Sequence, residues 1–466
     1  MGRSNGTWWG LGALGVLVTL GCGGLPLDGV GPQPGDDVAE GVVERAPVEP
    51  GQARNVLLIV ADDLGTDKVG AYQEHPSPPA TPSLDKLATE GVLFENAYGY
   101  GTGAATRAAL LTGRYGRRYG LGGPLRSDVD YELPLGEMLL PEMLTLAPEP
   151  WASAALGKWG LATDGSSSGA GHPTEQGFGS FAGTLDSLDR YEGFEKVVDG
   201  QVEKVKGYAT VDTTDDAIEQ LHRLRSPWLL YVAYHAPHEP AHVPPADVLG
   251  REVPRDATEA ERIDAAIEVL DKEIGRLLEA MSPRQREETL VVFLGDNGTA
   301  SPAVRPPLDS THAKNSLFEG GTNIPLLVRG PGVASGKRTK ALAHVVDLVP
   351  TVAASTGIDL DRLANPVDGT SLWPALGAPE GPGSRDFVYT EKFRPTGGGP
   401  YDIDWRSVRN DRYKLLDVGG SKPQFFELEG RFDDGMALRP AQLTPDEQAA
   451  YEALAAELDR MRAELP

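Results

Sequence analysis

The stretch Asn55 to Gly65, NVLLIVADDLG, places two carboxylates directly after a run of apolar residues. The five apolar residues from Val56 to Val60 predict a buried strand, because a strand covered on both faces shows no polar alternation. Asp62 and Asp63 then lie at the carboxyl end of that strand, which is the edge of an open α/β sheet where ligands bind. This stretch therefore predicts both a fold class and the place of a site.

A second apolar run ends in the same way much later in the chain. TLVVFLGDNG, residues 289–298, carries Asp296 and Asn297 at its end. Together with Asp62 and Asp63 these side chains form a set of hard oxygen donors that suits Ca²⁺ or Mg²⁺, whereas no Cys/His spacing suggests zinc. The alternative is that each pair only caps the turn after its strand, as Asp and Asn often do. Both interpretations stay open at this point.

The segments around these runs alternate between helix and strand patterns. Helices are predicted at 81–91, 133–147, 210–226 and 257–281, and strands at 151–160 and 227–240. This alternation predicts a mostly parallel sheet with helices on both faces. After about Arg385 the pattern changes: 406–418 and 423–430 predict strands of a small antiparallel sheet, and 444–464 predicts a closing helix. The predicted fold class is thus α/β, a large domain followed by a small C-terminal one.

The N-terminal segment predicts export. An apolar run from Trp8 to Leu20 follows Arg3, and it has the length of a signal-peptide core rather than of a membrane span. Cys22 is the single cysteine of the chain and follows Gly21, as in a bacterial lipoprotein cleavage site. We interpret residues 1–22 as an export signal ending in a lipobox, with a lipid anchor on Cys22. An ordinary secretion signal with an incidental cysteine is the alternative.

The next segment and the overall charge add to this interpretation. Residues 23–53 are rich in Gly, Pro and acids, which predicts a flexible tether. The predicted location is the bacterial cell envelope, as a periplasmic or surface lipoprotein, or otherwise the secreted fraction. The 466 residues carry a formal net charge of −25 without a basic patch, which argues against nucleic acid as a partner. A locally positive site for a small anion is still compatible with this charge.

Ten motifs in order make the chain similar to the sulfatase family, within the alkaline-phosphatase-like superfamily. They are NVLLIVADDLG, TPSLDKLATEGVLFENAYG, TRAALLTGR, ALGKWG, YVAYHAPHEP, FLGDNG, KNSLFEGGTNIPLLVRGPG, HVVDLVPTVAASTG, DGTSLWPAL and RNDRYKLL. The resemblance runs from about Asn55 to Glu429. It implies a large α/β domain with a central mixed sheet over residues 54–384. It also implies a C-terminal subdomain over residues 385–466, with an antiparallel four-stranded sheet and a helix.

The resemblance also implies roles for single residues. The residues that match the family's divalent-cation ligands, usually for calcium with magnesium or manganese as alternatives, are Asp62, Asp63, Asp296 and Asn297. Arg107 matches the arginine that supports the nucleophile and the metal. Lys158, His238 and Lys314 match residues that hold the sulfate and protonate or stabilise the leaving group. Such a set stabilises charge on a transferring group. The implied partner is an anionic sulfate or phosphate ester, either a small molecule or a glycan.

Two positions depart from the family pattern. Counting back from Arg107, Gly103 stands where the family has the cysteine or serine that is oxidised to formylglycine, the nucleophile. Gly160 stands where the family usually has a histidine. Glycine has no side chain to oxidise, so the usual sulfatase mechanism is predicted to be lost. His235 and His312 match no role in the family pattern.

Three interpretations follow from these departures. In the first, the chain is a hydrolase with another nucleophile, which is either Thr102 or a metal-bound water; a helix cap is the alternative role for Thr102. In the second, it is a non-catalytic protein that binds a sulfated or phosphorylated ligand. In the third, the pocket is a relic in an envelope protein. The retained metal-ligand candidates and basic residues argue against this third interpretation. Loops 166–181 and 305–315 are expected to set specificity.

Overall fold

The computed structural model describes residues 52–466 except 126–129, 421, 429–432 and 466. The export signal, the lipid anchor on Cys22 and almost all of the tether therefore lie outside the described residues and stay predictions. Within the described part of the chain, no helix combines the length and the apolar character that a membrane span needs.

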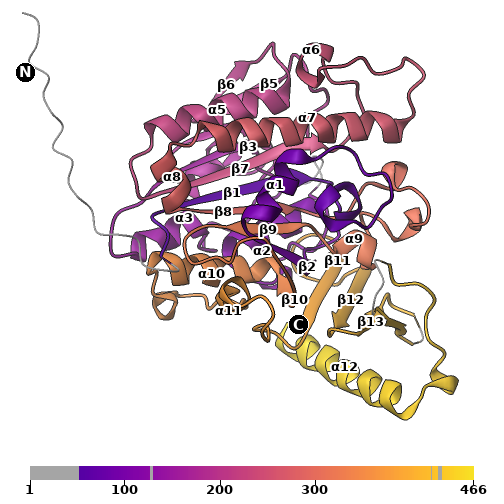
Figure 1. Cartoon of the computed structure of the whole chain (residues 1–466). Helices are drawn as coiled ribbons and strands as arrows, with labels where there is room; N and C mark the ends of the chain where they lie inside the picture. Colours follow the sequence, from indigo (N-terminus) through magenta and orange to yellow (C-terminus); the bar gives the residue numbers. More distant parts are fainter. Residues whose placement is uncertain (1–51, 126–129, 421, 429–432, 466) are drawn as a thin grey trace, which may run out of the picture. The chain divides into compact units, whose positions relative to one another are not determined.

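A mixed ten-stranded sheet forms the centre of the large domain (Figure 1). From one edge to the other its strands are β10 (Lys337–His344), β2 (Val92–Tyr98), β9 (Leu326–Arg329), β8 (Thr289–Gly295), β1 (Asn55–Asp62), β7 (Trp228–Pro237), β3 (Ala152–Lys158), β4 (Phe181–Thr184), β5 (Glu195–Val198) and β6 (Gln201–Lys204). Strands β8, β1, β7, β3 and β4 run parallel, whereas β9, β5 and β6 pair antiparallel with their neighbours. The predicted mostly parallel or mixed sheet is confirmed.

The central strand β1 explains where the site lies. All eight of its residues are buried, as expected for a strand between β7 and β8 with helices on both faces. Asp62 ends β1, and Asp296 follows the parallel neighbour β8. The two carboxylates predicted from distant parts of the sequence therefore meet at one edge of the sheet.

Helices cover both faces of this sheet, and Figure 1 shows α5 and α7 above the strands with α10 and α11 below them. One face packs against α1 (Pro82–Glu90), α5 (Ala209–Arg223) and α7 (Glu259–Ala280). The other packs against α2 (Gly103–Thr112), α3 (Leu140–Met143), α10 (Leu348–Thr356) and α11 (Trp373–Gly377). Short helices in the connections are α4 (His172–Glu175), α6 (Ala246–Leu249), α8 (Pro283–Glu288) and α9 (Glu319–Thr322).

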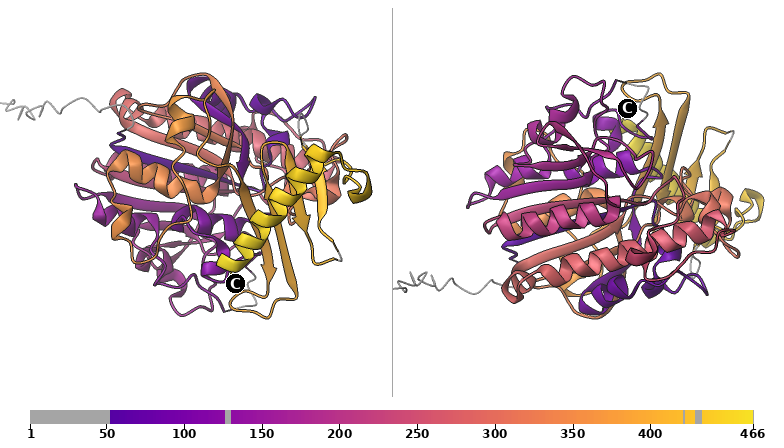
Figure 2. Two further views of the ribbon diagram at one scale, coloured as in Figure 1. Left: turned by 90° about the horizontal axis from the view of Figure 1, so that it is seen from below. Right: turned by 90° about the horizontal axis from the view of Figure 1, so that it is seen from above.

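A separate four-stranded antiparallel sheet follows near the end of the chain. Its strands, in spatial order, are β11 (Val388–Arg394), β12 (Ile403–Arg409), β13 (Tyr413–Asp417) and β14 (Gln424–Glu427). Helix α12 (Pro445–Glu464) contacts β12 and β13 and lies across these strands in the view from below (Figure 2). The predicted small antiparallel sheet with its closing helix is confirmed.

One predicted helix is much shorter in the structure. The segment 133–147 is helical only in α3, followed by a 3-10 turn at Leu144–Leu146. Pro141 lies in the first turn of α3, where its missing N–H group costs nothing, but a helix could not run through it from Leu133. The expectation of a helix over the whole segment is therefore wrong.

Candidate active site

The four predicted cation ligands lie together at the ends of β1 and β8. Asp63 has a φ of 69°, a left-handed conformation that aspartate tolerates better than most residues, and its N–H donates to Asp296 Oδ1 at 3.0 Å. Asn297 Nδ2 donates to Asp63 Oδ1 at 2.9 Å. Asp62, Asp63, Asp296 and Asn297 are all buried. Two strand ends that are more than two hundred residues apart thus form one cluster of oxygens.

The predicted basic residues contact this cluster from three other segments. Lys158, the last residue of β3, donates from Nζ to Asp62 Oδ2 at 2.6 Å and to Ser187 Oγ at 2.9 Å. Lys314 donates from Nζ to Asp63 Oδ2 at 2.7 Å. The Nε2 atom of His238, which follows β7, lies 3.9 Å from Asp63 Oδ2.

Arg107 enters the site from α2 and has no exposed surface. Its Nε donates to Asp296 Oδ2 at 3.1 Å, and its NH2 lies 2.9 Å from Asp296 Oδ2 and 3.5 Å from Asp62 Oδ2. Its NH1 donates to the carbonyl oxygen of Lys158 at 3.1 Å. One guanidinium therefore fixes two cation-ligand candidates and the end of β3 at the same time.

Burial and neighbouring charges shift the pKa values of Asp62 and Asp296 in opposite directions. Burial alone would raise the pKa of Asp62, but the charge of Lys158, followed by those of His238, Arg107 and Lys314, holds this pKa far below its ordinary value. The pKa of Asp296 is raised, first by burial and then by the charge of Asp62. An additional positive charge at the centre of the cluster would relieve this repulsion between carboxylates.

The donor set fits a hard divalent cation. Carboxylate and nitrogen atoms of Asp62, Asp63 and His238 lie within 4.8 Å of one another. Asn297 Oδ1 is buried without a hydrogen-bond partner among the described residues, as expected for an oxygen that is aimed at a cation. Oxygens of this kind are the donors that Ca²⁺ and Mg²⁺ prefer.

Both departures from the family pattern lie beside site residues: Gly103 beside Asp296 and Gly160 beside Arg107. Gly103 is the first residue of α2, and a Cβ atom on it would lie 3.1 Å from Asp296 Cγ, 3.6 Å from Asn297 Oδ1, and closer to Asp296 Oδ2 than van der Waals contact allows. Gly160 has a φ of 72°, and a Cβ there would lie 3.3 Å from Arg107 Cδ. A side chain at residue 103 would point into the carboxylates.

Thr102 precedes α2 and is buried. Thr102 occupies the N-cap position of α2, as the predicted alternative of a helix cap requires, but its hydroxyl makes no capping bond. Its Oγ1 also has no hydrogen-bond partner among the described residues, and no bond joins it to the carboxylate cluster. The nucleophile role of Thr102 stays a prediction.

His235, on β7, belongs to the site, although sequence reasoning assigned it no role. The hydroxyl of Thr184 donates to the Asp186 carbonyl at 2.5 Å, so His235 Nε2, 2.7 Å from Thr184 Oγ1, carries the proton. Its Nδ1 is buried without a described partner. Burial, and then the charge of Lys158, lower the pKa of His235 to about 3, so the ring is neutral. The signal in the sequence that could have placed His235 in the site is its position three residues before His238.

His312, by contrast, stacks on Phe318 with ring centroids 3.6 Å apart. This contact gives the imidazole a packing role beside the loop that carries Lys314.

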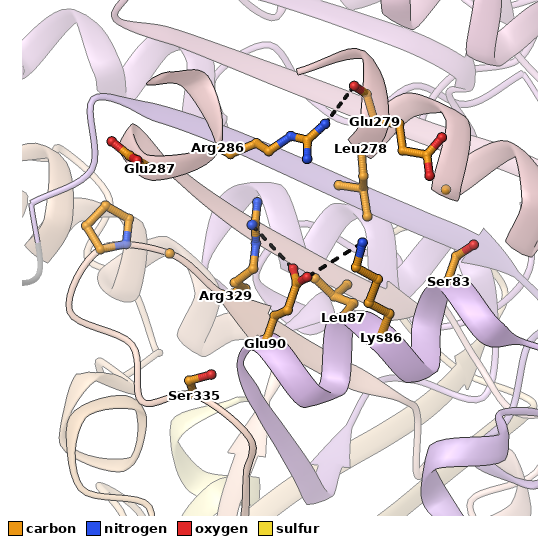
Figure 3. A pocket seen from close by; sticks show the side chains of 13 residues that line it. Ser83, Lys86, Leu87, Glu90, Leu278, Glu279, Arg286, Glu287, Arg329 and Ser335 are labelled. Carbon is orange, nitrogen blue, oxygen red and sulfur yellow. Dashed lines mark hydrogen bonds and ion pairs between the residues drawn. The ribbon is translucent and has the colours of Figure 1, made fainter. Parts of the chain in front are cut away.

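Two cavities help to define the surroundings. Ser187 and Thr184, the partners of Lys158 and His235, line a cavity of about 580 Å³ beside β4, β5 and β6. A second cavity of about 460 Å³ lies between α1, α7, α8 and the end of β9 (Figure 3). Its polar lining includes Lys86, Glu90 and Arg329, and it holds none of the predicted site residues. Of these two cavities, the first is the one whose lining includes partners of Lys158 and His235.

Comparison with known proteins shows the family of this chain. The family model described as Sulfatase matches residues 54–358. The chain is 32% identical to arylsulfatase A of Bos taurus over 377 residues, which covers 72% of this chain and 70% of that protein. It is 27% identical to the uncharacterized sulfatase YdeN of Escherichia coli (strain K12) over 374 residues, which covers 73% of this chain and 64% of that protein.

A solved structure is also similar over most of the chain. The crystal structure of Ps i-CgsB in complex with k-i-k-neocarrahexaose superimposes with a TM-score of 0.75 at 26% sequence identity. The match covers 88% of this chain and 92% of that one. With the family model spanning more than half of the sequence, this chain belongs to the sulfatase family.

Proposed function

We propose that this chain holds a divalent cation together with an anionic sulfate or phosphate ester in a hydrolase-type site, and that water rather than a side chain attacks the ester. The observation that carries this proposal is the cluster of buried carboxylates with two lysine ammonium groups bonded to it at 2.6 and 2.7 Å. Ammonium groups at this position can also bond the oxygens of a bound ester.

In this proposal the residues of the site have separate roles. The oxygens that would hold the cation belong to Asp62, Asp63, Asp296 and Asn297, with Ca²⁺ as the first candidate and Mg²⁺ or Mn²⁺ as alternatives. When bound, such a cation stabilises negative charge on the ester. Lys158 and Lys314 would orient the anionic group, and His238 would stand beside the leaving oxygen as a proton donor.

Water is the proposed attacking group because the side chains nearest the cluster do not supply one. Gly103, whose Cβ direction points at Asp296, has no side chain to oxidise. The hydroxyl of Thr102 has no described partner that could take its proton. Loss of a nucleophile normally costs many orders of magnitude in rate, so hydrolysis is expected to be slow.

A second candidate function is a non-catalytic ester-binding protein. It is favoured by the fact that Gly103 and Gly160 both lie beside site residues and both lack a side chain. The relic interpretation is disfavoured, because the ion pairs of Arg107 and Lys158 with the buried carboxylates are intact. Keeping such pairs buried is costly unless each charge is compensated.

The ligand class is an ester of a sugar or another alcohol that fits beside the site. The cavity that begins at Ser187 provides space for the alcohol part, and the complex of Ps i-CgsB with a neocarrahexaose makes a sulfated glycan the first candidate. If Cys22 carries a lipid as the sequence predicts, the site would be tethered at the cell envelope and would meet such a ligand there.

The test is turnover of an aryl sulfate, a phosphate monoester and a phosphate diester by purified protein, each with Ca²⁺, Mg²⁺ or Mn²⁺. We expect slow turnover that requires the cation and is lost in Asp296→Ala. Thr102→Ala should leave the rate unchanged if water attacks, and abolish turnover if threonine attacks. Absence of turnover with cation and sulfate still bound would select the non-catalytic candidate. Turnover at ordinary enzyme rates, about 1–10³ s⁻¹, would contradict the prediction that hydrolysis is slow because Gly103 replaces the nucleophile.

A further inference from the structure

In this structure the two site lysines occupy the same carboxylates that would hold the cation. Lys158 Nζ is bonded to Asp62 Oδ2 and Lys314 Nζ to Asp63 Oδ2. The carboxylates of Asp62, Asp63 and Asp296 already face the side-chain cations of Arg107, Lys158 and Lys314. A divalent cation would therefore have to share these carboxylates with the two lysines.

The two lysines differ in what holds them when a cation arrives. Lys158 has a second partner, Ser187 Oγ at 2.9 Å, and its side chain is 10% exposed. Lys314 makes its described hydrogen bond to Asp63 alone, and its side chain is 17% exposed. If Asp63 turns to a cation, Lys158 keeps a partner whereas the ammonium of Lys314 loses its bond and is repelled by the new charge.

We propose that Lys314 competes with the divalent cation for Asp63, and that an anionic ester relieves this competition by accepting the ammonium, so that cation and ester bind with strong positive cooperativity. This inference rests on the proposed cation and ester site. Each ligand then raises the affinity for the other by the same factor, because coupling between two binding equilibria is reciprocal. The cation alone binds weakly, and the ester alone binds weakly, while the pair binds tightly.

The physical basis is the strength of charge interactions in a buried site. Two positive charges a few ångströms apart repel one another strongly where water is largely excluded, and a carboxylate shared between them stabilises each less. A bound sulfate group adds negative charge and oxygens that can accept from Lys314. The expected coupling lies in the usual range of about five- to 150-fold in affinity.

The experiment is calorimetric titration of the purified protein with Ca²⁺, in the absence and presence of saturating inorganic sulfate. For the wild type we expect sulfate to raise Ca²⁺ affinity by about tenfold or more. In Lys314→Met, Ca²⁺ should bind more tightly than in the wild type without sulfate, and sulfate should add little. Lys158→Met should also raise Ca²⁺ affinity but keep most of the sulfate effect.

Two control variants test whether the effect on Ca²⁺ binding comes from the charge of Lys314 and whether a lysine far from the site has any effect. Lys314→Arg keeps the positive charge, so its Ca²⁺ affinity without sulfate should stay close to that of the wild type. Lys86→Met removes an exposed lysine from α1 and should change neither titration. Circular dichroism and thermal unfolding of each variant show whether it is folded.

Failure of the inference can be told apart from failure of the proposed function. Ca²⁺ binding that is not tightened by Lys314→Met, or a sulfate effect that survives in this variant, would overturn the coupling while the cation site stands. Absence of Ca²⁺ binding in the wild type and in both lysine variants, with and without sulfate, would overturn the coupling and the proposed cation site together.

Discussion

Arg107 shows at the scale of one residue how the site depends on balanced charge. Its guanidinium is fully buried between the carboxylates of Asp296 and Asp62. Removing one partner of a buried ion pair leaves an uncompensated charge, which is far more costly than replacing the whole pair. The arginine is therefore needed for stability as well as for the site.

We predict that Arg107→Met lowers the free energy of unfolding by about 3–5 kcal/mol. Added Ca²⁺ should restore part of this loss, because a cation at Asp62 and Asp296 replaces the missing positive charge and binds only the folded state. Chemical denaturation with and without Ca²⁺ checks both statements. The matched control is Arg223→Met, which removes an exposed arginine paired with Glu219 on α5 and should have little effect. Equal stability of Arg107→Met and the control would contradict the assignment.

The same scale shows what sequence could and could not predict about the site. Asp62, Asp63, Asp296 and Asn297 follow apolar runs, so the sequence could place each pair at a strand end, whereas the pairing of these two strands is a long-range contact. Lys158 and Lys314 were found only through the family motifs, since a lysine carries no local signal of its own. The tautomer of His235 depends on Thr184, which bonds to the ring from β4, and on the carbonyl of Asp186, to which Thr184 donates. No pattern around His235 contains those partners.

At the scale of elements, α1 is held to α7 by one carboxylate. Asp271 of α7 is 1% exposed and accepts the N–H groups of Ser83 and Leu84, the free donors in the first turn of α1, at 2.9 and 2.8 Å. Thr81, the residue before α1, makes no capping bond to this helix. The start of α1 is thus satisfied by a tertiary contact rather than by its own sequence.

We predict that Asp271→Ala lowers the free energy of unfolding by about 1–3 kcal/mol, because a buried N–H donor and a partly buried one lose their acceptor. The measurement is urea denaturation, with the neighbouring exposed residue in Lys272→Ala as control. A loss no greater than in that control would show that the first turn of α1 finds other acceptors.

The prediction of helices succeeded where a long segment kept helical periodicity, and it failed where a proline interrupted an apolar segment. Helix α7 follows strong periodicity and begins at a capping box of Thr258 and Glu261, so it was predictable from sequence. The segment 133–147 is apolar, but Pro141 restricts its helix to four residues. The short β9 is buried between β2 and β8, and its place depends on those partners rather than on its own sequence.

At the scale of the whole molecule, buried histidines make stability depend on pH. His344 is 2% exposed, accepts the Val346 N–H with Nδ1, and has no described partner at Nε2. Burial, and then the charge of Arg385, lower its pKa well below 6.5. Below pH 6.5 the unfolded chain therefore binds a proton at this residue that the folded chain does not, so stability falls as the pH falls.

We predict that the wild type loses stability between pH 6.5 and pH 5, and that His344→Asn loses less over the same interval. Asparagine keeps an acceptor for the Val346 N–H but does not titrate. Urea denaturation at several pH values provides the slope, and the comparison of the two proteins removes the contribution of all other groups. An equal slope for both proteins would show that His344 does not set this dependence.

The architecture as a whole was predictable because its sheet is built from buried runs joined by periodic helices. The mixed character of the large sheet was not evident from those runs, since β9 lies antiparallel between β2 and β8, β5 pairs antiparallel with β4, and β6 pairs antiparallel with β5. Pairing direction depends on long-range contacts that no local pattern encodes.

The most direct test of the account is a crystal structure of the protein grown with Ca²⁺ and sulfate. The account predicts one Ca²⁺ bound by oxygens of Asp62, Asp63, Asp296 and Asn297, with the ammonium of Lys314 moved from Asp63 to the sulfate. Calcium–oxygen distances of about 2.3–2.6 Å would identify the ion. A structure in which Lys314 stays on Asp63 and the cluster binds no cation, with calcium and sulfate present in the crystal, would contradict it.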